Sequence, residues 1–241
     1  MTQKIKILDH GFVRLVESWG GGDDKDLVKA EEREAGIIEA ARQSTQGGFK
    51  GWANDSRLLK YLYDNKHSTP FEFAGMVIEV KAPIFIFRQW HRHRTQSYNE
   101  MSARYGEVPS DDYTPTVERC LVVNEKNKQA GTLKDSQKLT HTFALNWLAG
   151  LENLYDQFED HYQDGLKNGI PKELARCGMP VGRYSQMRAS TSLRNWLAFL
   201  TLRLDPHAQW EIQQFAKAVA SLIEQEFPQT YKLFVNREEQ L

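Results

Sequence analysis

The segment from Arg88 to Tyr105 constrains the fold most, because a dense set of cationic side chains directly follows an apolar run that ends at Phe87. Four arginines and two histidines lie in these eighteen residues, with Glu100 as the only acidic side chain. The apolar run must be buried, while the arginines must line a cavity or face solvent. A planar guanidinium donates two parallel hydrogen bonds to a phosphate or carboxylate. The segment therefore predicts either an anion-binding site or a solvated arginine face.

Two other chemistries are disfavoured in this segment. His91 and His93 have no carboxylate or thiolate partner nearby and are flanked by arginines, which repel a divalent cation, so no metal is expected. Ser102 resembles a nucleophile only superficially, because the neighbouring arginines stay protonated and cannot take its proton. A serine hydroxyl that donates to a phosphate, beside Arg104, fits better.

Charge, cysteine content and hydropathy narrow the class of protein. The 31 Lys and Arg residues are balanced by 32 Asp and Glu residues, which leaves no broad basic surface for nucleic acid. Cys120 and Cys177 are too few for a disulfide framework and lack the spacing of a zinc or redox motif, which favours a reducing compartment. The N-terminus lacks the apolar core of a signal peptide, and no apolar run is long enough to cross a bilayer. We expect a cytoplasmic protein with no nucleic-acid or membrane partner, folded as one domain over residues 1–241.

Hydrophobic periodicity predicts both strands and helices in the first third of the chain. The predicted strands are 4–8, 12–17 and 76–81, and the predicted helices are 24–43 and 55–65. Pro70 restricts Thr69 to an extended conformation, so 67–72 is expected to be extended, with His67 and Thr69 forming one wall of a ligand site.

The residues from Ala82 to Phe87 are ambiguous, since Ile and Phe favour a strand whereas Pro83 suits the first turn of a helix. We favour a helix from Pro83 to His93. On that helix Gln89 and Arg92 are three residues apart and face one ligand together. The Gln89 amide offers a donor and an acceptor to a pyrimidine edge or a sugar.

The rest of the chain is predicted to be mainly helical. The expected helices are 137–167, a short one that begins at Pro171, one that carries the apolar stripe of 193–204, and a last one from Asp205 and Pro206 to Pro228; the expected strands are 120–123 and 184–189. Aromatic residues at helical spacing along 137–167 predict a core or subunit-interface face.

Three stretches of the sequence resemble one enzyme family. Arg92-His93-Arg94, seven further residues and then Ser102 match the RHR-seven-S signature of the flavin-dependent thymidylate synthases. The stretch from His67 to Glu72 resembles the H-x-T-P-F-E element of that family, and the stretch from His207 to Glu211 resembles its H-A-Q-W-E segment. The resemblance implies an α+β (mixed α/β) fold, in which a central, mostly antiparallel sheet is packed with long helices.

The resemblance also implies an activity. Members of the family reductively methylate dUMP to dTMP for dTTP synthesis, with methylenetetrahydrofolate as carbon donor, FAD as redox cofactor and NADPH as reductant. They are homotetramers whose sites are shared between subunits. Because no convincing cysteine nucleophile is present, the difficult step falls to the cofactor, while the protein supplies position and electrostatic field.

The resemblance assigns two sets of residues to ligands. The residues implied for FAD are Ser44, His67, Thr69, Glu72, Arg92, His93, Arg94, Glu100, Ser192, Leu193, Arg194, Ala198 and His207. Those implied for dUMP are Gln89, Trp90, His91, Arg92, Glu100, Met101, Ser102, Ala103, Arg104, Arg176 and Arg203. Arg203 is the residue credited with ionising N3 of dUMP, and it is the expected catalytic residue.

Three positions depart from the family pattern. Ser192 stands where asparagine is common, and Ala198 replaces a second asparagine that often contacts FAD, so its hydrogen bond must be lost or replaced. Ala103 stands where glycine is frequent.

Two rival functions remain open. In the first, Arg88 to Arg104 contact RNA phosphates while Trp90, Tyr98 and Tyr105 stack on bases, although the near-neutral charge argues against it. The second is a flavin-dependent methyltransferase that acts on a different pyrimidine.

Overall fold

The computed structural model describes residues 3–21, 33–122 and 139–238. Five strands form one antiparallel sheet in the order β1-β2-β3-β5-β4. The strands are β1 (Ile5–Ile7), β2 (Gly11–Trp19), β3 (Gly75–Pro83), β4 (Ser97–Glu100) and β5 (Tyr184–Ser192). The expected α+β fold with a mostly antiparallel sheet is confirmed, and three of the predicted strands and the return strand at 184–189 lie within this sheet.

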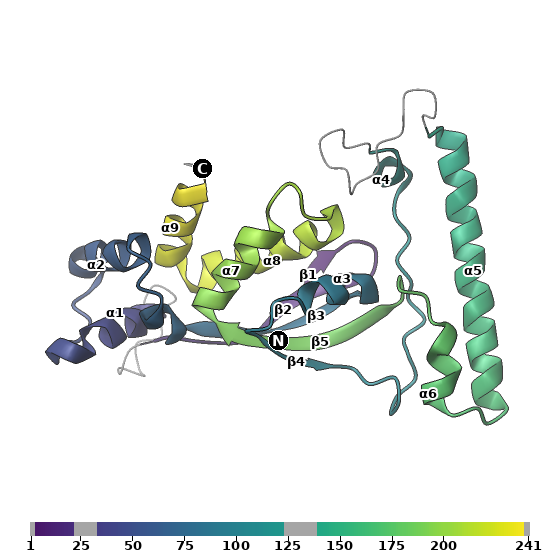
Figure 1. Ribbon diagram of the computed structural model, residues 1–241, viewed down its shortest axis with the longest axis horizontal. Coiled ribbons are helices and arrows are strands. Elements are labelled where there is room, and N and C mark those ends of the chain that lie inside the picture. The colour runs from purple at the N-terminus through teal and green to yellow at the C-terminus, as the bar shows by residue number, and fades with distance from the viewer. Residues whose placement is uncertain (1–2, 22–32, 123–138, 239–241) are drawn as a thin grey trace.

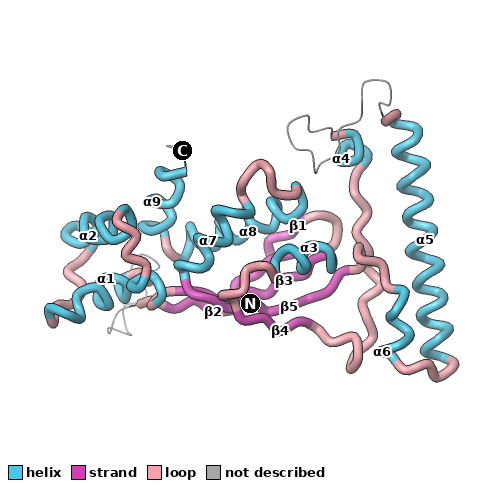
Figure 2. Tube along the Cα trace, viewed as in Figure 1, coloured by secondary structure: helices cyan, strands magenta, loops and turns pink. Residues whose placement is uncertain are grey.

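Helices pack on one face of the sheet (Figures 1 and 2). They are α3 (Ile84–Trp90), α7 (Leu193–Arg203) and α8 (Trp210–Glu226), with α1 (Ala35–Arg42), α2 (Trp52–Asp64) and α9 (Pro228–Glu238) toward one end. Met76, Ile78 and Val80 alternate along β3 and are fully buried beneath the helices. Trp90, Trp196 and other aromatic residues complete this core. Because α3 begins directly where β3 ends, it carries the arginine-rich segment out of the core.

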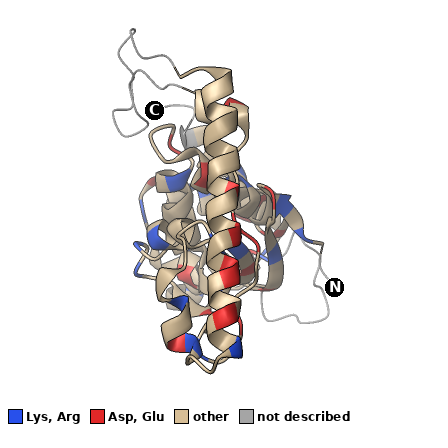
Figure 3. Cartoon of the chain, turned by 90° about the vertical axis from the view of Figure 1, so that its right-hand side faces the viewer, with Lys and Arg blue, Asp and Glu red and all other residues tan. Residues whose placement is uncertain are grey.

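Helix α5 (His141–Lys167) stands apart from the sheet, beside α4 (Val117–Leu121) and α6 (Lys172–Ala175). Arg183, which is 1% exposed, connects it to the rest of the chain through ion pairs with Glu159 at 2.7 Å and Asp112 at 3.1 Å. Phe143, Trp147 and other apolar side chains of α5 are exposed. Figure 3 shows acidic residues along one part of the same helix. No helix in the described parts of the chain is both long and apolar enough to cross a membrane.

Several predicted elements need correction. Thr69–Glu72 is a one-turn 3-10 helix rather than an extended segment, because Pro70 occupies its first turn, where a missing N–H costs nothing. The strand expected at 120–123 is wrong for its described residues, since Cys120 lies in α4. The Thr116 side chain caps this helix by accepting the Arg119 N–H at 3.2 Å, and that local hydrogen bond outweighs the strand propensity.

The last helical region also differs from the prediction. Asp205 does not start the final helix; its carboxylate accepts the His207 N–H at 2.7 Å and stabilises a separate turn, so α8 begins at Trp210. Pro228 opens a further helix, α9, instead of only ending one.

Strand β4 was not predicted. Residues 24–32 of the helix expected at 24–43 lie outside the described residues, and the described remainder forms α1 from Ala35 to Arg42.

Candidate active site

One cavity of about 650 Å³ lies between α3, the end of β4 and α6. Six residues assigned to dUMP from the sequence line it together: Glu100, Met101, Ser102, Ala103, Arg104 and Arg176. Arg88, from α3, completes its cationic wall. The strand β4 places Glu100 here by pairing with β5, and the Met101 N–H donates to the Gln186 carbonyl at 2.8 Å. The fold thus brings the end of the arginine-rich segment together with a residue much later in the chain.

The charges in this cavity suit an anionic ligand. Arg88, Arg104 and Arg176 outnumber the two carboxylates, Glu100 and Glu173. Glu100 accepts the Ser185 hydroxyl at 2.7 Å, which fixes the carboxylate on the cavity wall. Arg104 pairs with Glu173 at 2.9 Å, but both side chains are half exposed, so this pair is weak and a phosphate can compete for the guanidinium.

The guanidinium of Arg203 lies outside this cavity, against α3. Its Nε donates to His93 Nε2 and its Nη2 donates to the Gln89 carbonyl, both at 2.9 Å. Burial and the charge of Arg203 lower the pKa of His93 to about 4, so the imidazole is neutral at pH 7 and accepts this bond. Burial lowers the pKa of Arg203 itself, which nonetheless remains charged. Within the described chain, Nη1 of Arg203 is left for a ligand.

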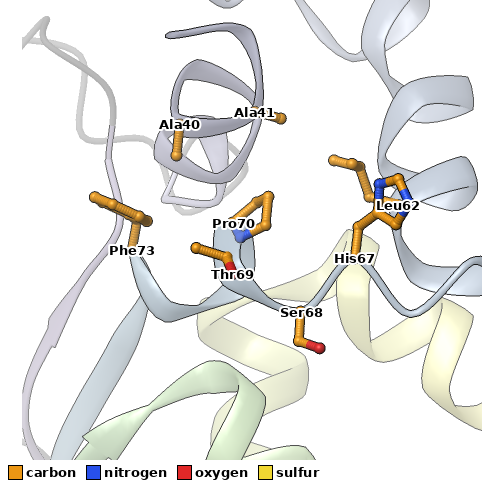
Figure 4. Close-up of a pocket in the computed structure, with 8 residues that line it drawn as sticks. All are labelled: Ala40, Ala41, Leu62, His67, Ser68, Thr69, Pro70 and Phe73. Atoms are coloured by element: carbon orange, nitrogen blue, oxygen red, sulfur yellow. The ribbon is translucent and has the colours of Figure 1, made fainter. Parts of the chain in front are cut away.

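Two further cavities gather residues assigned to the flavin. The first, of about 400 Å³, is lined by Ala40 and Ala41 of α1 and by the turn from His67 to Phe73. Figure 4 shows the two alanines facing Pro70, with Phe73 on one side and His67 on the other. The second, of about 200 Å³, shares His67 and is lined by Arg194, Ala198 and other residues of α7.

These two cavities fit a flavin dinucleotide. They combine apolar walls with cationic Lys66 and Arg194, as a large aromatic ligand with a pyrophosphate requires. Arg194 pairs with Glu72, another residue assigned to FAD. The Ser192 hydroxyl is buried without a partner among the described residues, so the chain alone leaves a hydrogen-bonding group unsatisfied. Thr201 and Lys66 line the cavity beside Ala198 and supply polar groups where this alanine has none.

Some assigned side chains lie elsewhere. Ser44, Arg92, Arg94 and His207 are exposed and line none of these three cavities. Trp90, which was assigned to dUMP, has a fully buried indole whose Nε1 donates to Gln96 at 3.1 Å, so its side chain belongs to the core.

The side chains of Leu193 and His91 also pack against other residues of the protein. Leu193 is fully buried, and its N–H donates to the Ala74 carbonyl at 2.7 Å, so its side chain belongs to the core. The His91 ring lies between Phe87 and Tyr98, and its buried Nε2 has no partner in the described chain.

Arg88, one of the four arginines from which an anion site was predicted, lines the anion cavity. Sequence reasoning missed four other residues around these cavities: Ser185 and Glu173 line the anion cavity, and Lys66 and Thr201 line the flavin cavities. Their positions depend on strand and helix pairing between distant segments. Among the described residues, no three His, Cys, Asp or Glu side chains gather in a possible metal site.

Known proteins share the sequence pattern of this chain. Residues 26–229 match the family model described as thymidylate synthase complementing protein. The chain is 38% identical to the flavin-dependent thymidylate synthase of Thermosipho africanus (strain TCF52B), with 96% of this chain and 94% of that protein covered. It is 36% identical to the enzyme of the same name from Wolbachia pipientis wMel, with 98% and 77% covered.

Two solved structures share the fold of this chain. The UMP/dUMP methylase PolB from Streptomyces cacaoi, bound with 5-Br dUMP, superposes with a TM-score of 0.78 at 29% identity over 96% of this chain and 97% of that one. Its complex with 5-Br UMP gives 0.77 at 30% identity, with 96% of both chains covered. Family model, relatives and structures agree over nearly the whole length, and the chain belongs to the thymidylate synthase complementing protein family.

Proposed function

We propose that this protein is a flavin-dependent thymidylate synthase that reductively methylates dUMP to dTMP for dTTP synthesis. Methylenetetrahydrofolate donates the carbon and NADPH is the reductant. The observation that carries the proposal is the 650 Å³ cavity, which gathers Glu100 to Arg104 with Arg176. These are the residues that the RHR-seven-S resemblance assigned to the nucleotide.

The anion cavity supplies the phosphate site. Arg88, Arg104 and Arg176 provide the charge, and the Ser102 hydroxyl provides a donor. Ser102 already accepts the Arg104 N–H at 3.3 Å, which orients its oxygen and leaves its proton for the phosphate. Without a base to take that proton, Ser102 binds substrate and does not attack it.

Arg203 acts on the pyrimidine ring. Bonds to His93 and to the Gln89 carbonyl hold its guanidinium before substrate arrives. A pre-oriented cation near N3 and O4 stabilises the negative charge that develops as the ring becomes reactive toward an electrophilic carbon. Because His93 is neutral, it orients Arg203 without adding a competing positive charge.

The flavin is held by His67, Thr69, Ser192 and Arg194 in the two cavities of the α1, α2 and α7 region. When bound, FAD supplies the redox chemistry of the reductive methylation. Apolar residues such as Leu197 and Phe71 exclude water from the ring system, while Arg194 meets negative charge on the cofactor.

The complete site is shared between subunits of a homotetramer. Arg88 lines the anion cavity, whereas Arg203 lies outside it and donates to the Gln89 backbone carbonyl, which supports a site that a second chain completes. A second copy is needed to bring Arg203 to a nucleotide in the cavity. The exposed Phe143, Trp147 and Leu154 of α5 supply apolar area for such contacts.

The experiment that tests this proposal has three measurements. A purified preparation is expected to absorb as oxidised flavin, to bind dUMP and to form dTMP from dUMP, methylenetetrahydrofolate and NADPH. A colourless protein that binds RNA would support the rival binding function instead. Flavin-loaded enzyme that binds dUMP without forming dTMP would refute the synthase assignment.

A second substrate is favoured by one observation. The superposed PolB structures contain 5-Br UMP in one case and 5-Br dUMP in the other. UMP and dUMP should therefore be compared at equal concentrations. A kcat/KM for UMP above that for dUMP would make this protein a methylase of ribonucleotides.

A further inference from the structure

A buried carboxylate lies at the start of a hydrogen-bond chain that ends at Gln89. Glu211, in the first turn of α8, is 3% exposed. It accepts hydrogen bonds from Arg119 Nε at 2.7 Å, from the Tyr113 hydroxyl at 3.2 Å and from Gln209 Nε2 at 2.7 Å. Burial alone would raise its pKa, but the bonds from Arg119 and Gln209 and the Arg119 charge lower it overall. Glu211 is therefore ionised at pH 7 and can only accept.

This carboxylate determines the orientation of the next two amides. Since Glu211 has no proton to donate, Gln209 must turn its Nε2 toward it. The opposite end of the Gln209 amide, Oε1, then faces Gln89 and accepts its Nε2 at 2.5 Å. Gln89 in turn keeps its own Oε1 directed away from Gln209. In the described part of the chain this oxygen has no hydrogen-bond partner.

The backbone of Gln89 contacts the guanidinium of Arg203, the expected catalytic residue. The Gln89 backbone carbonyl accepts Arg203 Nη2 at 2.9 Å, and the same helix carries Arg88 into the anion cavity. Residue 89 thus holds Arg203 through its backbone and presents a side-chain acceptor, Oε1. A flipped Gln89 amide would present its NH2 group in place of this oxygen and would reject a ligand that offers a proton.

We propose that Glu211 is a positioning residue that sets the hydrogen-bonding polarity of the nucleotide site. Through Gln209 it turns the side-chain oxygen of Gln89, Oε1, toward the substrate. The inference rests on the proposed function and on the resemblance, which assigns Gln89 to dUMP. The site then selects a pyrimidine nucleotide that donates a hydrogen bond to this oxygen, either from a sugar hydroxyl or from the ring N3–H. Glu211, Gln209 and Arg119 thereby contribute to specificity without touching substrate.

A purely structural role for Glu211 predicts something different. Arg119 and Tyr113 join α4 and its preceding loop to α8 through this carboxylate, so its loss also weakens that contact. Such an effect would be independent of Gln89. A double-mutant cycle separates the two roles, because residues that act through one another are non-additive.

The test uses flavin-loaded, full-length enzyme and measures dUMP affinity by titration calorimetry, with KM for dUMP alongside. Glu211→Gln preserves the size of the side chain but can donate a hydrogen bond to Gln209, so the Gln209 amide is no longer held in one orientation. We expect dUMP to bind roughly tenfold more weakly, which corresponds to the loss of about one hydrogen bond. Gln89→Ala should weaken binding similarly. Glu211→Gln should have no further effect in the Gln89→Ala background. Equal losses in both backgrounds would overturn the proposal.

Gln209→Ala provides a second route, since Gln209 is exposed and its replacement leaves the core intact. It should also weaken dUMP binding, and only when Gln89 is present. Unchanged affinity in Gln209→Ala would overturn the relay even if Glu211→Gln fails to fold.

Two analogues identify the donor. The 2′,3′-dideoxy analogue of dUMP lacks the sugar hydroxyl, and 3-methyl-dUMP lacks the ring proton. The analogue that lacks the relevant donor should bind wild-type enzyme and Glu211→Gln with equal affinity. If both analogues retain the full difference, the proposal is wrong. Wild-type enzyme that binds no dUMP would refute the proposed function as well, whereas an active wild type with an additive cycle refutes the relay alone.

Discussion

Replacing Arg203 with alanine tests whether this guanidinium acts on the pyrimidine. The substitution removes a donor held by 2.9 Å bonds to His93 Nε2 and to the Gln89 carbonyl. Loss of one pre-oriented donor that stabilises transition-state charge lowers kcat by about 10²- to 10³-fold. The free energy of unfolding should fall by only about 1–3 kcal/mol, the value of two hydrogen bonds, because the half-buried side chain leaves the apolar stripe of α7 intact.

The assay is the initial rate of dTMP formation by flavin-loaded enzyme, with chemical unfolding measured in parallel. Arg57→Ala is the matched control, since Arg57 is exposed on α2 and lines none of the three cavities. Arg203→Lys keeps the charge but not the fork of donors, and its loss of rate should be intermediate. A folded, flavin-loaded Arg203→Ala enzyme with the wild-type rate would refute the assignment.

The same variant gives an independent readout at His93. Burial and the Arg203 charge together lower the His93 pKa to about 4. Removing the charge leaves only burial, so the His93 pKa should rise in Arg203→Ala, as measured by NMR titration of the imidazole. An unchanged pKa would mean that the two groups do not interact in solution.

Three further predictions concern substrate, stability and pH. Arg176→Ala should weaken dUMP binding about tenfold while FAD affinity is kept; loss of FAD instead would contradict the separation of the cavities. Glu34, fully buried, accepts the N–H groups of Gln229 and Thr230 at 2.7 Å each. Glu34→Ala should therefore cost about 1–3 kcal/mol in urea unfolding and Glu34→Gln less, and equal costs would argue against capping of α9. Since the His93 pKa is about 4 when folded and ordinarily 6.5, neutral His93 contributes stability above pH 6.5 that is lost as pH falls toward 4. His93→Gln should flatten the stability profile in that window, and an unchanged profile would exclude His93 as its cause.

Local patterns were sufficient to predict most of the sheet and the core. Alternation in β3 and β5 identifies buried faces because each strand has one side against the helices, whereas the buried residues of β2 lie together at its start. Strand β4 escaped prediction because Ser97–Glu100 is short and mostly exposed, and it exists only because β5 offers an edge to pair with. Helix α4 escaped because a single capping bond from Thr116 outweighs the strand propensity of Cys120 to Val122.

The site was predictable only where a motif spans it. The RHR-seven-S signature identified the residues from Glu100 to Arg104, which do line one cavity. It also identified Trp90, whose side chain the fold uses for the core, since a motif does not distinguish ligand contact from packing. The hydrogen bond between Gln89 and Gln209 joins residues 120 positions apart. No local pattern encodes a contact of that kind.

In the proposed homotetramer, adjacent residues of α3 serve two different active sites, and this arrangement has a genetic consequence. In the proposed shared site, Arg88 serves one nucleotide cavity, while Gln89 and Arg203 serve the cavity of another copy. Two inactive alleles, one defective in Arg203 and one in Arg176, would therefore complement each other when expressed together. Subunits from the two alleles would assemble at random into mixed tetramers. Some shared sites would then contain both substitutions and others would contain neither, and the sites with neither would restore growth without thymidine.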